Sequence, residues 1–322
     1  HSRRFDLAGR MTFMPAFEQA KDFPSPRDHL PRVPFGQFGG HAFAAIAPAF
    51  AGTPIDQTRP LDANGQVEID NLKGRIQVRA WDRNEVRVTG SLGAGVEKLV
   101  VEGNGRHLLV KAQYPRRTNS SVEPTTLLLQ VPLQASLDID SVSADIDIDG
   151  VAPGDLQIDT VSGDIVATAA PRRARIESVS GDQRLTLNSP RVGVETVSGD
   201  VVLSGRLKAE VSAETVSGDV RIDSRGEALQ RLRIGSVSGN ADARVALASG
   251  GEVRAETVSG DVRLVLPRAL SAQVEASSFS GDLVAPGAKA QKEGFGAGST
   301  LNHRYGNGDG ENGGDAEADP LY

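Results

Sequence analysis

Thr160-Val161-Ser162-Gly163-Asp164 recurs, almost letter for letter, along half of the chain. The copies start at Ser141, Thr160, Ser178, Thr196, Thr215, Ser236, Thr257 and Ser278. By subtraction, successive starts lie 19, 18, 18, 19, 21, 21 and 21 residues apart. A near-constant period of this length is typical of a repeat architecture, in which each unit buries its apolar face against its neighbours.

Each copy lies between two short stretches in which every second residue is apolar. Leu156 and Ile158 precede the second copy, and Ile165 and Ala167 follow it. Period-two spacing indicates β-strands, and Gly163 supplies the backbone freedom for a turn between them. We therefore predict an all-β fold, a single-stranded β-helix-like solenoid with coils of about 18–21 residues. An antiparallel meander is the alternative. Stacking in register is expected to place a column of Val inside and columns of Ser, Gly and Asp at the corner.

Four positions depart from the repeat. Ala144 replaces Gly, Asn240 replaces Asp, Phe279 replaces Val, and Gln183 occupies an apolar position. We expect the packing of these coils to be looser than that of the others.

Four segments are predicted. Residues 137–285 form the repeat solenoid, and residues 52–136 form a β-rich N-terminal capping unit. Within that unit, Val67 to Val78 aligns with Leu156 to Ala167, which predicts a degenerate first coil. Trp81, the single Trp of the chain, is expected to cover the open end of the core, since solenoid ends need capping.

The two terminal segments differ in composition from the repeats. Residues 1–51 hold eight of the ten Phe and both Met, and they end in Ala49-Phe50-Ala51, a signal-peptidase pattern. We expect an export signal there; a disordered Pro-rich arm is the alternative. Residues 286–322 are rich in Gly, Asn and Asp, and we expect a disordered tail because such a composition buries little apolar area.

Composition restricts the classes of partner. The 322 residues carry a net charge of −7, so nucleic acid is not expected to bind. There is no Cys, which excludes disulfides and thiolate metal sites. No apolar run approaches the roughly 18 residues that span a bilayer.

The repeats, together with the Val67-Glu-Ile-Asp-Asn71 stretch that precedes them, resemble the bacterial DUF4097 group of β-strand-repeat proteins, which carries the label "putative adhesin". The related head-GIN-domain proteins are similar too. The resemblance covers about Gly65 to Asp282. It implies an exported, envelope-associated β-helical protein, and it provides no catalytic residues to carry over.

Two carboxylate patterns are candidate cation sites. The corner column consists of Asp145, Asp164, Asp182, Asp200, Asp219, Asp261 and Asp282. These side chains are expected to cap the turns, and a ladder of cation sites is the alternative. Asp145 to Gly150 matches the first half of an EF-hand loop, but Leu156 stands where that motif needs Glu. We reject an EF-hand, whereas the nearby Asp138, Asp140, Asp147 and Asp149 leave a weak Ca²⁺ site open.

Two further columns are expected on the surface. Thr160 and Ser162, with their equivalents, are expected to bond within the turn, and a flat hydroxyl array that binds ice or glycans is the alternative. A second acidic column consists of Asp159, Glu177, Glu195, Glu214 and Glu256. It is expected to form cross-coil ion pairs with Arg175, Arg184, Arg221, Arg254 and Arg263.

No catalytic constellation is evident. Residues 137–285 contain no His, Trp or Tyr and a single Lys, Lys208, so a Ser-His-Asp arrangement has no base there. We predict a non-enzymatic, exported binding or structural surface, periplasmic or on the cell surface, without cofactor, whose ligand is an envelope or extracellular protein or glycan. A divalent-cation-binding solenoid and a carbohydrate-active β-helix enzyme are the alternatives.

Overall fold

The computed structural model describes residues 52–115, 122–267, 271–292 and 298–306, together with four short strands before residue 50. The chain divides into two units, residues 1–50 and 51–322. In the first unit, β1 (Arg4–Phe5) pairs with β2 (Met11–Phe13), and β3 (Phe35–Phe38) pairs with β4 (His41–Ala44). The Ala49-Phe50-Ala51 pattern of the expected export signal lies outside the described residues.

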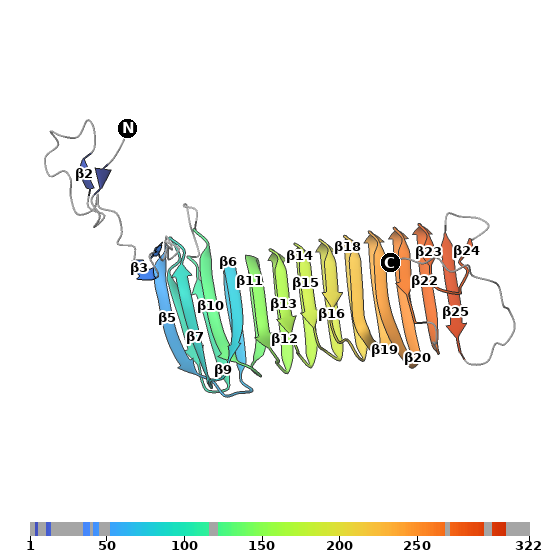
Figure 1. Ribbon diagram of the computed structural model, residues 1–322, viewed down its shortest axis with the longest axis horizontal. Coiled ribbons are helices and arrows are strands. Elements are labelled where there is room, and N and C mark those ends of the chain that lie inside the picture. Colours follow the sequence, from blue (N-terminus) through green and yellow to red (C-terminus); the bar gives the residue numbers. More distant parts are fainter. Residues whose placement is uncertain are drawn as a thin grey trace. The chain divides into compact units, whose positions relative to one another are not determined.

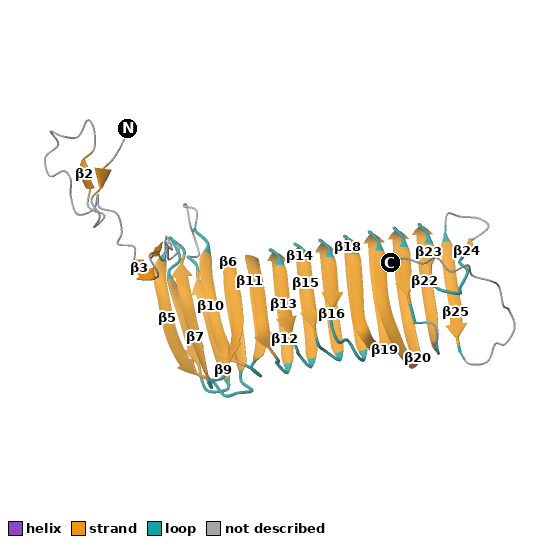
Figure 2. Ribbon diagram, in the orientation of Figure 1, coloured by secondary structure: helices purple, strands orange, loops and turns teal. Residues whose placement is uncertain are grey.

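The second unit consists of one continuous hydrogen-bonded sheet of 21 strands, β5 to β25. Its strands lie side by side along one axis (Figure 1) and are joined by short connections at the edges (Figure 2). The described part of the chain contains strands, bends and turns and no helix. The predicted all-β solenoid is confirmed.

Each coil has one strand before the Val-Ser-Gly-Asp corner and one after it. The pre-corner stack contains β12 (Asp155–Ser162), β14 (Arg173–Ser180), β16 (Arg191–Ser198), β18 (Glu210–Ser217) and β22 (Ala272–Ser280). The post-corner stack contains β13 (Ile165–Ala169), β15 (Gln183–Leu187), β17 (Val201–Ser204), β21 (Val262–Val265) and β23 (Leu283–Val284). Four longer strands pass from one stack to the other: β6 (Gln66–Trp81), β11 (Ser136–Val151), β19 (Val220–Ser238) and β20 (Ala241–Ser259).

Neighbouring coils pair in parallel and in the register of the repeat. Ile158 lies opposite Ile176, and Thr160 lies opposite Ser178. Parallel pairing between successive copies excludes the antiparallel meander. The degenerate first coil is also confirmed, because Ile69 pairs with Ile139, which in turn pairs with Ile158.

The core runs along the inside of the coils as columns of buried apolar side chains. In the pre-corner stack, Leu156 and Ile158 are fully buried, and in the post-corner stack Ile165 and Ala167 are buried as well. A single cluster extends from Ile55 to Leu301. The capping unit and the repeats therefore share one core.

The corner differs from the expectation in one respect. The Val column, predicted to lie inside, is outside: Val161 is 47% exposed, whereas Thr160 is 6% exposed. The alternation that buries Leu156 and Ile158 continues to Thr160, which also points inward. Val161, the next residue, therefore points outward. In the seven repeats from Ser141 to Thr257, a buried Thr or Ser is thus followed by an exposed Val.

Glycine at the corner allows successive coils to approach closely. Gly181, Gly199 and Gly218 have φ between 112° and 148°, a range that side chains resist. A Cβ added to Gly199 would lie 2.2 Å from the carbonyl oxygen of Gly181 in the preceding coil. Ala144, which replaces Gly in this column, is buried and is not among the residues with positive φ.

Both stacks are extended at the N-terminal end by strands of the capping unit. In the pre-corner stack, β9 (His107–Gln113) pairs with β6, and β8 (Lys98–Gly103) pairs with β9. In the post-corner stack, β10 (Thr125–Pro132), β7 (Glu85–Leu92) and β5 (Thr53–Pro60) follow outward from β6. These strands, and not Trp81, cover the core; Trp81 lies half-buried at the rim and donates from Nε1 to the Glu85 carbonyl at 2.7 Å.

The C-terminal end has a cap that the sequence did not predict. β25 (Ser299–Tyr305) pairs antiparallel with β22, and β24 (Gln291–Lys292) pairs with β25. The expected disordered tail over residues 286–322 is therefore wrong for residues 299–305. The outer edge of β22 offers backbone groups that need partners, and Leu301 buries its side chain against the last coil.

The corner glycine yields a first prediction. Gly199→Ala places a methyl group against the Gly181 backbone and forces a positive φ on a residue with a Cβ. We expect the free energy of unfolding to fall by at least about 2 kcal/mol. Urea unfolding followed by circular dichroism measures this change.

Gly193→Ala is the matched control. An added Cβ at Gly193 has nothing within 4 Å, and no positive φ is present there, so its effect is expected to stay within about 0.5 kcal/mol. Equal effects of the two substitutions would contradict the corner explanation.

A second prediction concerns Gln183, which is fully buried in the column that contains Ile165 and Val201. Both polar atoms of its amide lack a hydrogen-bond partner among the described residues. A buried, unsatisfied polar group costs about 1–3 kcal/mol. We expect Gln183→Leu to raise the free energy of unfolding by about that amount.

Gln157→Leu serves as its control, because Gln157 is exposed and donates to Asp159 at 2.8 Å. No gain is expected there. A Gln183→Leu chain that unfolds at the same urea concentration as the unmodified protein would show that the buried amide is not a defect.

Candidate functional site

A groove of about 1080 Å³ runs along the outer face of the pre-corner stack, across successive coils. Its floor consists of the buried Thr or Ser of each repeat, such as Thr160 and Ser178. One wall is formed by the residue before this Thr or Ser, and the other by the Val after it. The groove therefore results from the repeat itself, because each coil contributes the same three positions.

The apolar wall is a ladder of exposed valines, here called the Val ladder. It consists of Val142, Val161, Val179, Val197, Val216, Val237 and Val258. Each is between 45% and 50% exposed. A continuous stripe of half-exposed apolar side chains is unusual on a protein surface and indicates an interaction site.

The opposite wall is a ladder of carboxylates, here called the acid ladder. It consists of Asp70, Asp140, Asp159, Glu177, Glu195, Glu214 and Glu256. Gly235 takes the corresponding place between Glu214 and Glu256. Neighbouring strands lie about 4.8 Å apart, so this wall concentrates negative charge along the groove.

Three members of the acid ladder have a basic partner. Glu177 pairs with Arg175, and Glu256 pairs with Arg254 at 2.6 Å. Lys111 lies 2.5 Å from Asp70. Within the described part of the chain, no ion pair involves the other four members, which are Asp140, Asp159, Glu195 and Glu214.

The predicted cross-coil ion pairs are corrected by these contacts. Arg175 and Arg254 pair with residues two positions away in their own strands. Arg184 and Arg221 pair with the corner carboxylates Asp182 and Asp219, at 3.2 and 3.6 Å. Side chains two residues apart lie on the same face of a strand. These Arg side chains therefore pair within their own coil and not with a neighbouring coil. Arg263 has no ion pair within the described residues.

Negative charge is densest at the N-terminal end of the groove. Burial raises the pKa of Asp140, and the carboxylates of Asp138, Asp159, Asp70 and Glu68 raise it further. The pKa of Asp138 is raised as well, first by burial and then by Glu68 and Asp159. Positive charge here would relieve the repulsion.

Lys111 provides part of this positive charge. A hydrogen bond to Asp70 raises the pKa of Lys111. His107 lies 3.3 Å from Glu68.

The corner carboxylates cap the turns. The backbone N–H of Asp182 donates to Asp164 Oδ1 at 3.0 Å, and that of Asp219 donates to Asp200 Oδ1 at 2.9 Å. Each corner carboxylate from Asp145 to Asp261 thus accepts a hydrogen bond from the next coil. Asn240 continues this series with its side-chain oxygen, which accepts from the N–H of Asp261 at 3.0 Å. The position requires an acceptor and not a charge, which does not favour a ladder of cation sites.

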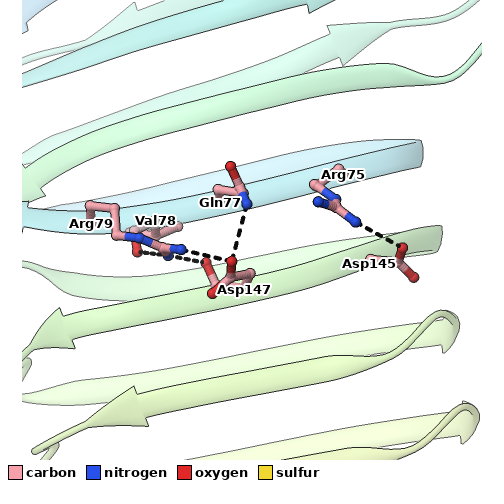
Figure 3. A network of polar contacts seen from close by, with 6 residues as sticks. All are labelled: Arg75, Gln77, Val78, Arg79, Asp145 and Asp147. Carbon is pink, nitrogen blue, oxygen red and sulfur yellow. Dashed lines mark hydrogen bonds and ion pairs between the residues drawn. The ribbon is translucent and has the colours of Figure 1, made fainter. Parts of the chain in front are cut away.

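The carboxylates from Asp145 to Asp149 lie along β11, where Asp147 is held by the neighbouring strand. Figure 3 shows Gln77 and Arg79 of β6 pointing toward Asp147 and Arg75 pointing toward Asp145. Arg79 donates to Asp147 Oδ2 at 2.7 Å, which lowers the pKa of Asp147. The described residues contain no group of three or more His, Asp or Glu side chains that could hold a metal ion.

The hydroxyl columns do not form an outer array. Thr160 and Ser178 are buried, and each donates to the carbonyl of the Ser two residues later. Ser162 and Ser180 donate to the carbonyls of Val142 and Val161 in the preceding coil. These hydroxyls therefore bond within the corner, as the turn interpretation predicted, whereas the buried hydroxyls of Thr215 and Ser236 have no partner among the described residues.

The sequence prediction identified the acid ladder but missed its apolar neighbour. Asp159 and Val161 are two residues apart in one strand and therefore share a face. The alternation that starts at Leu156 could have revealed the Val ladder, because it places Val161 on the same outer face as Asp159. The ladder was missed because Val161 was assigned to the core.

Among the described residues, no helix is long and apolar enough to cross a membrane. The family profile "Toastrack DUF4097" matches residues 64–305, most of the chain. The chain belongs to the Toastrack DUF4097 family. This assignment confirms the resemblance that the repeats indicated.

Solved structures of bacterial proteins resemble the chain only distantly. One, described as a "putative adhesin" from Parabacteroides distasonis, is 13% identical, with a TM-score of 0.46 over 73% of this chain and 98% of that one. A second, a "putative lipid binding protein" from the same species, is 12% identical, with a TM-score of 0.43 over 73% and 98%.

A third, a "putative adhesin" from Bacteroides fragilis, is 11% identical, with a TM-score of 0.40 over 73% of this chain and 97% of that one. No curated protein matches the chain. At these levels of identity and TM-score, the described roles of the three proteins provide no argument about this one.

The charge pattern of β11 yields a third prediction. Asp140 has a raised pKa, so its carboxylate costs stability at pH values above that pKa, and the cost disappears as the pH falls below the unfolded value of about 3.9. Asp140→Asn removes the repulsion. We expect a gain of up to about 1 kcal/mol at pH 7, and a smaller gain as the pH falls toward 4.

Asp147→Asn, in the same strand, is the control of opposite sign. The pKa of Asp147 is lowered by Arg79, so its carboxylate stabilises the fold above the unfolded pKa, and this contribution is lost as the pH falls through the lowered value. Its substitution should cost about 0.5 kcal/mol at pH 7. Urea unfolding at several pH values measures both, and changes of equal sign would contradict this assignment of charges.

Proposed function

We propose that this chain is a non-enzymatic binding protein of the bacterial envelope and that the groove is its binding surface. The observation that supports this proposal is the pairing of two continuous ladders, one apolar and one acidic, along the same groove. Both ladders face solvent and remain available for a ligand. The apolar side chains exposed there offer a favourable free energy of burial to a partner.

A binding role agrees with the way the repeat uses its other polar groups. The corner carboxylates accept backbone N–H groups of the next coil, and the hydroxyls of Ser162 and Ser180 donate to carbonyls of the preceding coil. These groups are engaged in holding the coils together. The Val ladder and the four acid-ladder members without an ion pair among the described residues have no such structural task.

Export to the periplasm or the cell surface is the second half of the proposal. It is supported by the Ala49-Phe50-Ala51 pattern and by the composition change that follows it. The resemblance of the repeats to exported proteins supports it as well. An adhesin-like role, in which the groove holds a component of the envelope or of the surroundings, fits both halves.

One fractionation experiment tests both halves. The tagged full chain, produced in its own cells, is expected in the washed envelope fraction. A variant with Val161→Thr, Val179→Thr and Val197→Thr is expected to move to the soluble exported fraction, because it lacks apolar area in the groove but keeps strand-forming residues. Val166→Thr with Val202→Thr, on the opposite outer face, is the control that should be retained.

Two results would contradict the proposal. Recovery of the unmodified chain in the cytoplasm would refute export. Equal retention of the groove variant and of its control would show that the groove is not the binding surface.

A further inference from the structure

The groove also indicates which chemistry its partner has, an inference that rests on the proposed function. We propose that the groove binds a basic amphipathic peptide helix, with its basic stripe on the acid ladder and its apolar stripe on the Val ladder.

The unpaired carboxylates supply the first step. Asp140, Asp159, Glu195 and Glu214 form no ion pair within the described part of the chain, whereas Glu177 and Glu256 are neutralised by Arg175 and Arg254. The carboxylates without a direct ion pair therefore lie between Asp140 and Glu214, with Lys111 and Arg175 as the nearby positive charges. A partner with several positive charges in a row would match them.

The arrangement of the two ladders supplies the second step. Asp159 and Val161 are two residues apart in one strand, or about 6.6 Å. The same pair recurs in each coil, about 4.8 Å further along the groove. A matching ligand must therefore present a basic stripe and an apolar stripe side by side, each with a short axial repeat.

An α-helix meets this requirement. Its turn rises 5.4 Å, and residues three or four positions apart lie on one face. One basic residue per turn can follow the carboxylates, since flexible Lys stems absorb the small difference in spacing. The six steps from Asp140 to Glu256 span about 29 Å, which corresponds to about 19 residues of helix. On each side of an extended strand, side chains repeat about every 6.6 Å, compared with about 4.8 Å between coils. The two spacings no longer match after two coils.

Other occupants fit less well. Nucleic acid and anionic lipid surfaces carry the same sign of charge as the acid ladder. A second copy of this chain would oppose one acid-lined groove with another. A glycan would need aromatic platforms, and each member of the Val ladder is aliphatic. The apolar and acidic walls together favour a cationic, amphipathic polypeptide.

The test uses the purified full chain and a synthetic 18-residue Leu/Lys peptide with adjacent Leu and Lys stripes at helical spacing. We expect binding in calorimetry, a gain of helicity in circular dichroism, and weaker binding as salt rises. Two control peptides are a permuted peptide of the same composition and a Leu/Glu peptide of the same pattern. Both are expected to bind at least tenfold more weakly.

Groove variants locate the site. Glu195→Gln with Glu214→Gln is expected to weaken binding roughly three- to tenfold. Val179→Thr with Val197→Thr is expected to weaken it by a similar factor. Glu102→Gln with Val202→Thr, both exposed and outside the groove, is the matched control that should bind as the unmodified chain does.

Three outcomes would overturn the proposal. The permuted peptide binds equally well, the groove variants bind as tightly as the control pair, or the peptide binds without becoming helical. Preferential binding of vesicles made of phosphatidylcholine and phosphatidylglycerol would identify a lipid surface instead, and self-association in sedimentation would identify a second copy. If envelope retention depends on the Val ladder but the Leu/Lys peptide does not bind, the helix is wrong and the proposed function stands.

Discussion

The close approach of successive backbones at the glycine corner is the contact on which the rest of the structure depends. A Cβ at Gly199 would lie 2.2 Å from a carbonyl oxygen of the preceding coil, so no side chain fits between the coils there. This approach fixes one register for every pair of neighbours. Once the corners coincide, all other columns coincide too, inside and outside.

Identical columns have opposite consequences in the core and on the surface. In the core, stacking of identical residues gives continuous apolar packing, and a buried polar side chain such as Gln183 finds no hydrogen-bond partner. On the surface, stacking of identical residues brings carboxylates of the same charge together. Together with burial, their repulsion raises the pKa of Asp140. The corner avoids this problem because its carboxylates receive N–H groups from the next coil. The acid ladder has no such arrangement, and its charge remains available to a partner.

Much of the fold could be predicted from the sequence, because the repeat length, the turn glycine and the apolar alternation all indicate one architecture. The direction of the Val side chains could not. Counting by twos from Ile158 places Val161 outside, whereas counting back from Ile165 places it inside. The two strands disagree, and the geometry of the corner decides.

The groove was missed for the same reason, since only its acidic wall had been assigned to the surface. The cap formed by β25 escaped prediction because the Gly- and Asp-rich composition around it outweighed the alternation of Ser299, Leu301 and His303. That strand also depends on the open edge of β22, a feature that exists only after the coils have stacked.

The caps at both ends have a consequence for how such a molecule can change in length. Every internal coil presents the same edges as its neighbours, so a whole coil can be duplicated or deleted without altering either cap. Each duplication would lengthen the groove by about 4.8 Å and add one rung to both of its walls. The number of repeats thus sets the length of the groove, and gene duplication can change the length of the molecule that the groove accommodates.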